Sequence, residues 1–79
     1  MTRDQFITWL KVHNYTQDKY GHFQKQAGSK TYRYKVSQSA ARYEFKADIC
    51  GHNEWIRIAS NYLKYLSITA DGKLSGLKR

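Results

Sequence analysis

Proline is absent from this chain of 79 residues, and Cys50 is its one cysteine. A single cysteine cannot form a disulfide within the chain, which excludes the class of small secreted proteins that disulfides hold together. Without proline, exposed strand edges must be protected by charged side chains. The short length and the lack of linkers predict one domain over residues 1–79, with a thin hydrophobic core.

Long apolar runs are absent as well. No apolar run approaches the roughly 18–20 residues that cross a bilayer. The first residues contain no apolar segment like that of a secretory signal peptide. We therefore expect a soluble, cytoplasmic protein without a membrane partner.

Acidic residues are scarce: Asp and Glu number 6 against 14 Lys and Arg, which gives a formal net charge of +8. Between positions 19 and 46, seven basic residues accompany a single acidic residue, Glu44. Clustered positive charge favours association with polyanions, above all nucleic acid. A simpler interpretation is that the charge aids solubility, because small domains tolerate a net charge of this size.

Motifs for catalysis are also missing, since no G-x-S-x-G, P-loop or dinucleotide-binding glycine pattern occurs. The nearest approach to a metal site is Cys50 and His52 with either His22 or His13. Structural zinc sites need four ligands, usually in two close-spaced pairs, and only one such pair is present. The Cys50–His52 spacing does not by itself direct an imidazole toward the sulfur. We expect no enzyme activity, no metal and no cofactor.

The N-terminal residues predict a helix over Thr2–Asn14. Thr2 and Gln5 have the spacing of a capping box, in which each side chain bonds the backbone N–H of the other. Asn14 is a suitable stop, because asparagine tolerates the left-handed conformation. One face of this helix carries the apolar and aromatic spacing i, i+3, i+4, i+7, with Phe6, Trp9, Leu10 and His13.

Two segments in the middle of the chain alternate between ring-bearing or aliphatic side chains and charged ones. Successive side chains of a strand point to opposite faces, so each segment has one apolar face and one mostly basic face. In residues 31–36 the two sets are Tyr32, Tyr34 and Val36 against Arg33 and Lys35. In residues 42–49 they are Tyr43, Phe45, Ala47 and Ile49 against Arg42, Glu44, Lys46 and Asp48.

Short turns predict how these strands pair. A turn at Gly28-Ser29 joins a strand over residues 20–26 to the strand over 31–36. It pairs Phe23 with Tyr34 and Lys25 with Tyr32, and, on the other face, Gln24 with Arg33 and His22 with Lys35. A turn over residues 50–53 joins the strand over 42–49 to one over 54–59. It pairs Phe45 with Ile58 and Ala47 with Ile56, and, on the other face, Lys46 with Arg57 and Asp48 with Trp55.

The remaining residues predict one more hairpin, over 66–69 and 73–77, whose loop Ala70–Gly72 pairs Ile68 with Leu74. Residues 60–64 fit either a helical turn or an irregular strand. The expected fold is therefore α+β, with one N-terminal helix packed on an antiparallel meander sheet of five or six short strands. The expected core is Phe6, Leu10, Phe23, Tyr34, Val36, Tyr43, Phe45, Ile49, Ile56, Ile58, Ile68 and Leu74, with Trp9 at its margin.

The basic face of this sheet is the candidate for function. Lys and Arg neutralise phosphates, and an aromatic side chain can stack on an unpaired base. The face therefore predicts a non-catalytic nucleic-acid-binding accessory protein, for DNA or RNA alike. The alternative is an ordinary solvated sheet face on which Glu44 and Asp48 pair with the basic side chains. The candidate contact residues are Arg33, Lys35, Arg42, Lys46, Trp55 and Arg57.

A second functional interpretation is a small protein-binding module or inhibitor, of the type found in phages and mobile elements. Such a module would dock on an acidic partner protein through an edge strand or its tyrosines, which are enriched at protein interfaces. Salt-dependent binding to oligonucleotides would distinguish the first interpretation from the second. Both interpretations are compatible with a homodimer.

Overall fold

The computed structural model describes residues 1–47 and 54–79, and the α+β fold expected from the sequence is confirmed. One helix precedes five strands, a short 3-10 helix and a final hairpin. In chain order these elements are α1 (Arg3–Val12), β1 (Thr16–Gln17), β2 (Phe23–Ala27), β3 (Lys30–Val36), β4 (Ala40–Ala47), β5 (Ile56–Tyr62), η1 (Leu63–Tyr65), β6 (Ser67–Ile68) and β7 (Leu74–Ser75).

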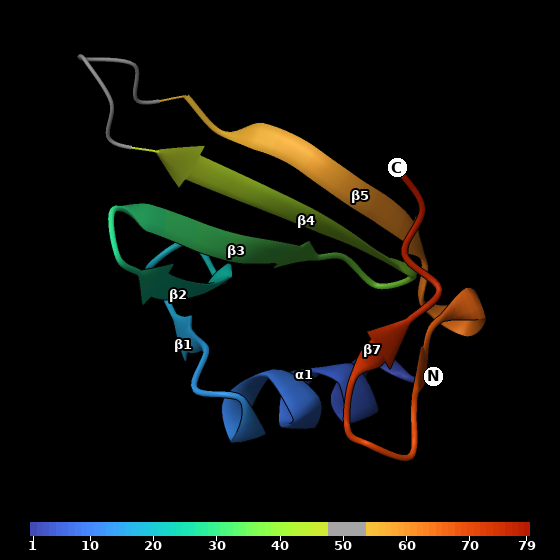
Figure 1. Ribbon diagram of the computed structural model, residues 1–79. Helices are drawn as coiled ribbons and strands as arrows, with labels where there is room; N and C mark the ends of the chain where they lie inside the picture. The colour runs from blue at the N-terminus through green and yellow to red at the C-terminus, as the bar shows by residue number, and fades with distance from the viewer. Residues whose placement is uncertain (48–53) are drawn as a thin grey trace.

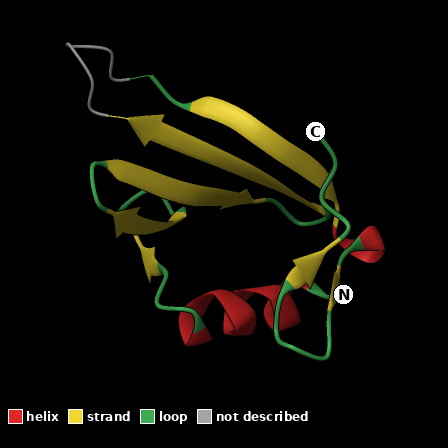
Figure 2. Ribbon diagram, viewed as in Figure 1, coloured by secondary structure: helices red, strands yellow, loops and turns green. Residues whose placement is uncertain are grey.

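The sheet is an antiparallel meander in which strands β1 to β5 lie in the order of the sequence. β6 and β7 form a separate two-stranded sheet. Figures 1 and 2 show two layers, with α1 along one face of the sheet and β7 beside α1. The C-terminal residues run next to β5, where Ser60 and Lys78 form an isolated antiparallel bridge.

The helix begins and ends as its sequence predicts. Thr2 is the N-cap, and the capping box with Gln5 is formed in both directions. The N–H of Gln5 donates to Oγ1 of Thr2 at 3.2 Å, and the N–H of Thr2 donates to Oε1 of Gln5 at 2.9 Å. Asn14 has a φ of 68° and so takes the left-handed conformation that stops the helix.

The segment before β2 differs from its prediction, because the expected strand over residues 20–26 begins only at Phe23. Asp18 organises a turn whose carboxylate accepts hydrogen bonds from the N–H groups of Tyr20 and His22, each at 2.9 Å. Gly21 completes the turn with a φ of 82°. The two-residue strand β1, which pairs with β2, was not expected, because two residues carry no readable alternation.

The pairing of β2 with β3 follows the predicted register, with Phe23 opposite Tyr34, Lys25 opposite Tyr32 and Gln24 opposite Arg33. Gly28 in the connecting turn has a φ of 63°. The predicted pair of His22 with Lys35 lies one step before the first residue of β2, outside the ladder.

The predicted register of β4 with β5 is wrong by two residues, because Phe45 pairs with Ile56 and not with Ile58. A β-bulge between Tyr43 and Glu44 leaves Ile58 as the extra residue on β5. The predicted register would have set Lys46 against Arg57, two like charges. In the observed register Glu44 is directly opposite Arg57, and this pair of opposite charges stabilises the sheet. The expected turn over 50–53, Ile49 and the pair involving Asp48 lie outside the described residues.

The ambiguous residues 60–64 divide between the two predicted alternatives. β5 continues to Tyr62, and η1 begins at Leu63. The last hairpin has the expected pairing of Ile68 with Leu74, over a loop in which Gly72 has a φ of 82°.

The core lies between α1 and the sheet. Phe6, Leu10, Phe23 and Tyr34 are buried as expected, whereas Ile56 is 54% exposed and Ile68 is 43% exposed. α1 covers only part of the five-stranded sheet, so Ile56 at the start of β5 stays open to solvent (Figure 1), whereas Ile68 belongs to the separate β6–β7 sheet. Trp9 is partly buried against the core, as predicted. The other buried hydrophobic residues, which were not expected, are Ala41, Ala59, Leu63 and Leu66.

Candidate functional site

The outer face of the five-stranded sheet, defined as the side away from α1, carries its polar side chains in transverse rows. Direct cross-strand partners share a face, so the pairing registers place these residues side by side. The first row, at the end of the sheet where β3 leads into β4, consists of Lys35, Arg42 and Ser60. His22 precedes the first paired residue of β2 and lies beside this row. The second row consists of Gln24, Arg33, Glu44 and Arg57.

The second row contains a buried carboxylate shared by two arginines. Glu44 is only 3% exposed although it lies on the outer face. Its Oε1 atom is 2.8 Å from Nε of Arg33, and its Oε2 atom is 3.0 Å from Nε of Arg42. Burial of a carboxylate is tolerated when it is paired and hydrogen-bonded. Because two arginines share one carboxylate, one of the two positive charges is not compensated within the trio.

Trp55 covers the Arg33 side of this network. The guanidinium carbon of Arg33 lies 3.8 Å from the centroid of the Trp55 ring, and Nζ of Lys46 lies 5.2 Å from it. The side chain of Arg33 is consequently only 15% exposed, whereas that of Arg42 is 51% exposed. Arg33 is thus occupied by internal contacts, and Arg42 presents its guanidinium to solvent.

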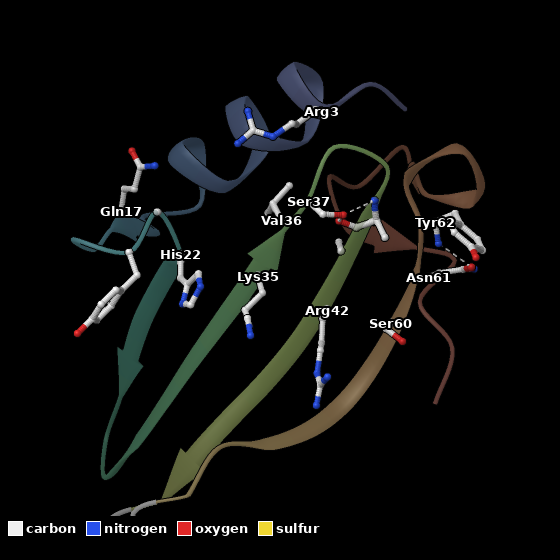
Figure 3. A pocket seen from close by; sticks show the side chains of 14 residues that line it. Arg3, Gln17, His22, Lys35, Val36, Ser37, Arg42, Ser60, Asn61 and Tyr62 are labelled. Carbon is white, nitrogen blue, oxygen red and sulfur yellow. Dashed lines mark hydrogen bonds between the residues drawn. The ribbon is translucent and has the colours of Figure 1, made fainter.

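The first row is the most basic part of the outer face. Lys35 on β3 pairs directly with Arg42 on β4, and Arg42 pairs with Ser60 on β5. Figure 3 shows the side chains of Lys35 and Arg42 next to each other between His22 and Ser60. Nη1 of Arg57 donates a hydrogen bond to Oγ of Ser60 at 3.3 Å, which connects the two rows. Lys35 and Arg57 are exposed.

An open groove of about 710 Å³ runs across the sheet at this first row. Its basic residues are Lys35, Arg42 and Arg3, which reaches it from the first turn of α1. None of its described lining residues is acidic. The other residues that line it are Gln17, Tyr20, Gly21, His22, Val36, Ser37, Ala40, Ala41, Ser60, Asn61 and Tyr62.

His22 sits at the β2 end of the groove in a fixed position. Its Nδ1 atom is buried and, within the described part of the chain, has no hydrogen-bond partner. Oδ2 of Asp18 is 3.9 Å away, which is too long for a direct hydrogen bond. The backbone N–H of His22 donates to the other oxygen of the same carboxylate. Asp18 therefore orients this loop and places a carboxylate beside the imidazole.

The opposite, inner face of the sheet is lined by tyrosines that pack with one another. The rings of Tyr34 and Tyr43 stack with centroids 4.5 Å apart, and Tyr15 meets Tyr34 edge to face at 5.4 Å. Burial raises the pKa of Tyr34 and of Tyr43 well above the ordinary value of 10.0, and the neighbouring tyrosine Tyr15 raises both further. These hydroxyls are neutral at physiological pH, and the inner face serves packing.

The six sequence-predicted contact residues fall into two groups. Lys35, Arg42 and Arg57 lie in or next to the groove, whereas Arg33, Lys46 and Trp55 gather around the buried network. Arg3, Tyr20 and Tyr62 line the groove but were not among the candidates. Their contribution depends on the tertiary packing of α1 and on the β5 register, for which the sequence has no local signal.

Two further observations concern other classes of site. Among residues 1–47 and 54–79, no group of three or more His, Cys, Asp or Glu side chains is arranged to hold a metal ion. Cys50 and His52 lie outside these residues. In the same described part of the chain, no helix is both long and apolar enough to cross a membrane.

Comparison with known proteins gives no match: no protein-family model, no curated protein and no solved structure is significantly similar to this chain. The functional conclusion therefore rests on the chemistry of its own residues.

Proposed function

We propose that this chain is a non-catalytic nucleic-acid-binding accessory protein that contacts phosphates with its outer sheet face. The observation that carries the proposal is the direct opposition of Lys35 and Arg42 on neighbouring strands. Like charges in opposed positions destabilise a sheet. A bound phosphate would compensate both charges and so offset the repulsion between these two side chains.

The surroundings of this pair support the proposal. The described lining of the groove has no acidic residue, and Arg3 adds a third cation from α1. The carboxylate of Glu44, which contacts Arg42 from outside the groove, is shared with Arg33 and so compensates only one of these two arginines. Arg57 lies beside the groove through its hydrogen bond to Ser60. In this proposal Lys35, Arg42 and Arg57 contact phosphates. Arg33, Lys46 and Trp55 support the face through the buried network.

Binding at several salt concentrations tests the proposal. Three phosphate contacts predict a slope of log affinity against log salt of about −2 for a single strand and about −3 for a duplex. Lys35→Gln with Arg42→Gln should reduce that slope to about −1 and weaken binding to every sequence alike. Fluorescence anisotropy with labelled single-stranded and duplex oligonucleotides measures both quantities.

A charge-matched control uses Lys11→Gln with Lys73→Gln, two exposed lysines of α1 and the last hairpin that do not line the groove. This variant loses the same net charge and should keep the wild-type slope. If it weakens binding as much as the groove variant, net charge alone is responsible. The absence of salt-dependent binding by the wild type to either oligonucleotide would refute the proposal.

Docking to an acidic partner protein is the second candidate function. It is favoured by the pair Tyr62 and Tyr65, whose rings meet edge to face at 6.3 Å although they are 57% and 59% exposed. Tyrosine is enriched at protein interfaces. A partner that is retained from nuclease-treated lysate, and released by Tyr65→Ala but not by the groove variant, would support this function instead.

A further inference from the structure

Two exposed tyrosines stand at opposite ends of the groove. Tyr20 lies in the loop that precedes β2, and Tyr62 ends β5, so the width of strands β2 to β5 separates them. Tyr20 is 72% exposed and Tyr62 is 57% exposed. Single exposed aromatics are common, but here both line the same groove as the basic pair of the first row.

The backbone at each tyrosine is held in place while the ring remains accessible. The N–H of Tyr20 donates to Oδ1 of Asp18 at 2.9 Å, and the N–H of Tyr62 donates to Oδ1 of Asn61 at 2.8 Å. The amide of Asn61 in turn donates to the carbonyl oxygen of Gly76 at 2.7 Å. Fixed backbones with open rings reduce the ordering cost of binding.

A lysine that does not itself line the groove lies close to each of the two rings. Nζ of Lys19 lies 5.1 Å from the centroid of Tyr20, and Nζ of Lys64 lies 5.9 Å from that of Tyr62. The same combination of aromatic ring and cation thus occurs at both ends, with Lys35 and Arg42 between them. Stacking platforms joined by a cationic path are what proteins use to bind unpaired nucleotides.

The dimensions define the length of the ligand. Three interstrand spacings of about 4.8 Å separate β2 from β5, a span of roughly 14 Å. At about 3.4 Å per phosphate along one stacked strand, this span accommodates about four nucleotides. A duplex would offer the two rings only sugars and phosphates, whereas a single strand offers base faces that can stack on them.

We propose that the groove binds a single-stranded segment of about four nucleotides, with phosphates on Lys35 and Arg42 and the outer bases stacked on Tyr20 and Tyr62. This inference rests on the proposed function and adds the class of nucleic acid to it. The contacts involve the phosphate backbone and base faces, so single-stranded DNA and RNA are both ligands.

The experiment measures anisotropy with labelled eight-nucleotide oligo-dT and oligo-rU, a duplex of the same length, and an abasic strand of the same length. We expect Tyr20→Ala and Tyr62→Ala each to weaken single-strand binding about 5- to 100-fold. Tyr20→Phe and Tyr62→Phe should retain wild-type affinity within about twofold, because the ring remains. Duplex affinity should not change, and the abasic strand should bind the wild type as weakly as the alanine variants bind oligo-dT.

Val12→Ala is the control, because Val12 is an apolar side chain that is 72% exposed but does not line the groove. It should bind oligo-dT as the wild type does. Thermal melting by circular dichroism should show that all tyrosine variants remain folded, since the substituted rings are exposed.

The outcomes separate this inference from the proposed function. If the alanine variants bind oligo-dT normally while the Lys35→Gln, Arg42→Gln variant does not, the protein binds phosphates but the stacking inference is overturned. Equal wild-type affinity for duplex and single strand would overturn it too. Equal binding of polyglutamate and oligo-dT by the wild type would overturn both and indicate an acidic protein partner.

Discussion

The Nε atom of Arg33 lies 2.8 Å from Oε1 of Glu44, whose side chain is 4% exposed. This ion pair, together with the contact of Arg42 on the other carboxylate oxygen, makes Glu44 the electrostatic centre of the outer face. On strand β3, this arrangement assigns one cation to the stability of the fold and another to ligand binding. Arg33 and Lys35 both point outward from β3, but only Lys35 is exposed.

The first prediction concerns the loss of this carboxylate. Glu44→Gln should lower the free energy of unfolding by about 2–4 kcal/mol, because two arginines would lose the charge that compensates them. Urea unfolding at neutral pH measures the change. Asp71→Asn, which removes an exposed carboxylate from the last hairpin, should change stability by less than about 0.5 kcal/mol. Equal effects from the two substitutions would contradict the central role of Glu44.

The second prediction compares two cations of β3. Arg33→Gln should destabilise the protein by about 1–3 kcal/mol, because it removes the contacts with Glu44 and Trp55. Lys35→Gln should leave stability within about 0.5 kcal/mol, or raise it slightly, because it relieves the repulsion with Arg42. Chemical unfolding of both variants tests this contrast. A larger loss for Lys35→Gln than for Arg33→Gln would reverse the assigned roles.

The third prediction concerns Gly76, whose φ is 105°. A Cβ atom at this position would clash with the carbonyl oxygen of Tyr65, so Gly76→Ala should destabilise the protein by about 2–4 kcal/mol. Gly28 also has a positive φ, but a Cβ there meets open space. Gly28→Ala should therefore cost only about 1–2 kcal/mol, from backbone strain alone. Thermal melting of the two variants should preserve this order.

The fourth prediction concerns alkaline pH. Burial raises the pKa of Tyr34 and of Tyr43 in the folded state above the ordinary value of 10.0. Above pH 10 the unfolded chain therefore loses these protons first, and stability falls as the pH rises. For Tyr34, the more deeply buried of the two, the fall is up to about 1.4 kcal/mol per pH unit. Below pH 10 this contribution is fully present. Urea unfolding between pH 8 and pH 11 should show a smaller decline for Tyr34→Phe than for the wild type, and an equal decline for both would contradict the prediction.

The fifth prediction concerns the helix cap. Thr2→Ala should lower stability by about 1 kcal/mol, because the N–H of Gln5 loses its acceptor. Thr8→Ala is the matched control on the same helix. The Thr8 hydroxyl only donates to the carbonyl oxygen of Asp4, and alanine is the better helix former, so stability should stay the same or rise slightly. Thermal unfolding distinguishes the two outcomes.

Local patterns were sufficient to predict α1 and the β2–β3 hairpin. The capping box sets the start of the helix, and Gly28 sets a turn so short that only one register brings Phe23 beside Tyr34. The β4–β5 pairing could not be predicted in the same way. Its register depends on a bulge that brings Glu44 opposite Arg57, and alternation alone does not reveal an extra residue.

The candidate site shows a similar limit. Alternation correctly placed Lys35 and Arg42 on the outer face, but it could not show that they are direct partners across the short β3–β4 connection. It also could not distinguish the covered Arg33 from the open Lys35. That difference arises from Trp55 and Glu44, which lie on other segments of the sheet. Arg3 joins the groove only through the packing of α1.

The extra residue Ile58 determines which chemical groups β5 displays in its last half. Arg57 and Ser60 share a side of the strand although three positions separate them, which a regular two-residue repeat forbids. If β5 kept Ile58 but lacked the bulge, regular alternation would turn the hydroxyl of Ser60 and the phenol of Tyr62 toward the helix and would send Ala59 and Asn61 outward in their place. Deleting Ile58 would remove the bulge and leave these four residues on the sides that they occupy now. The single extra residue of β5 therefore decides that a hydroxyl and a phenol, and not a methyl and an amide, stand beside the basic side chains of β3 and β4.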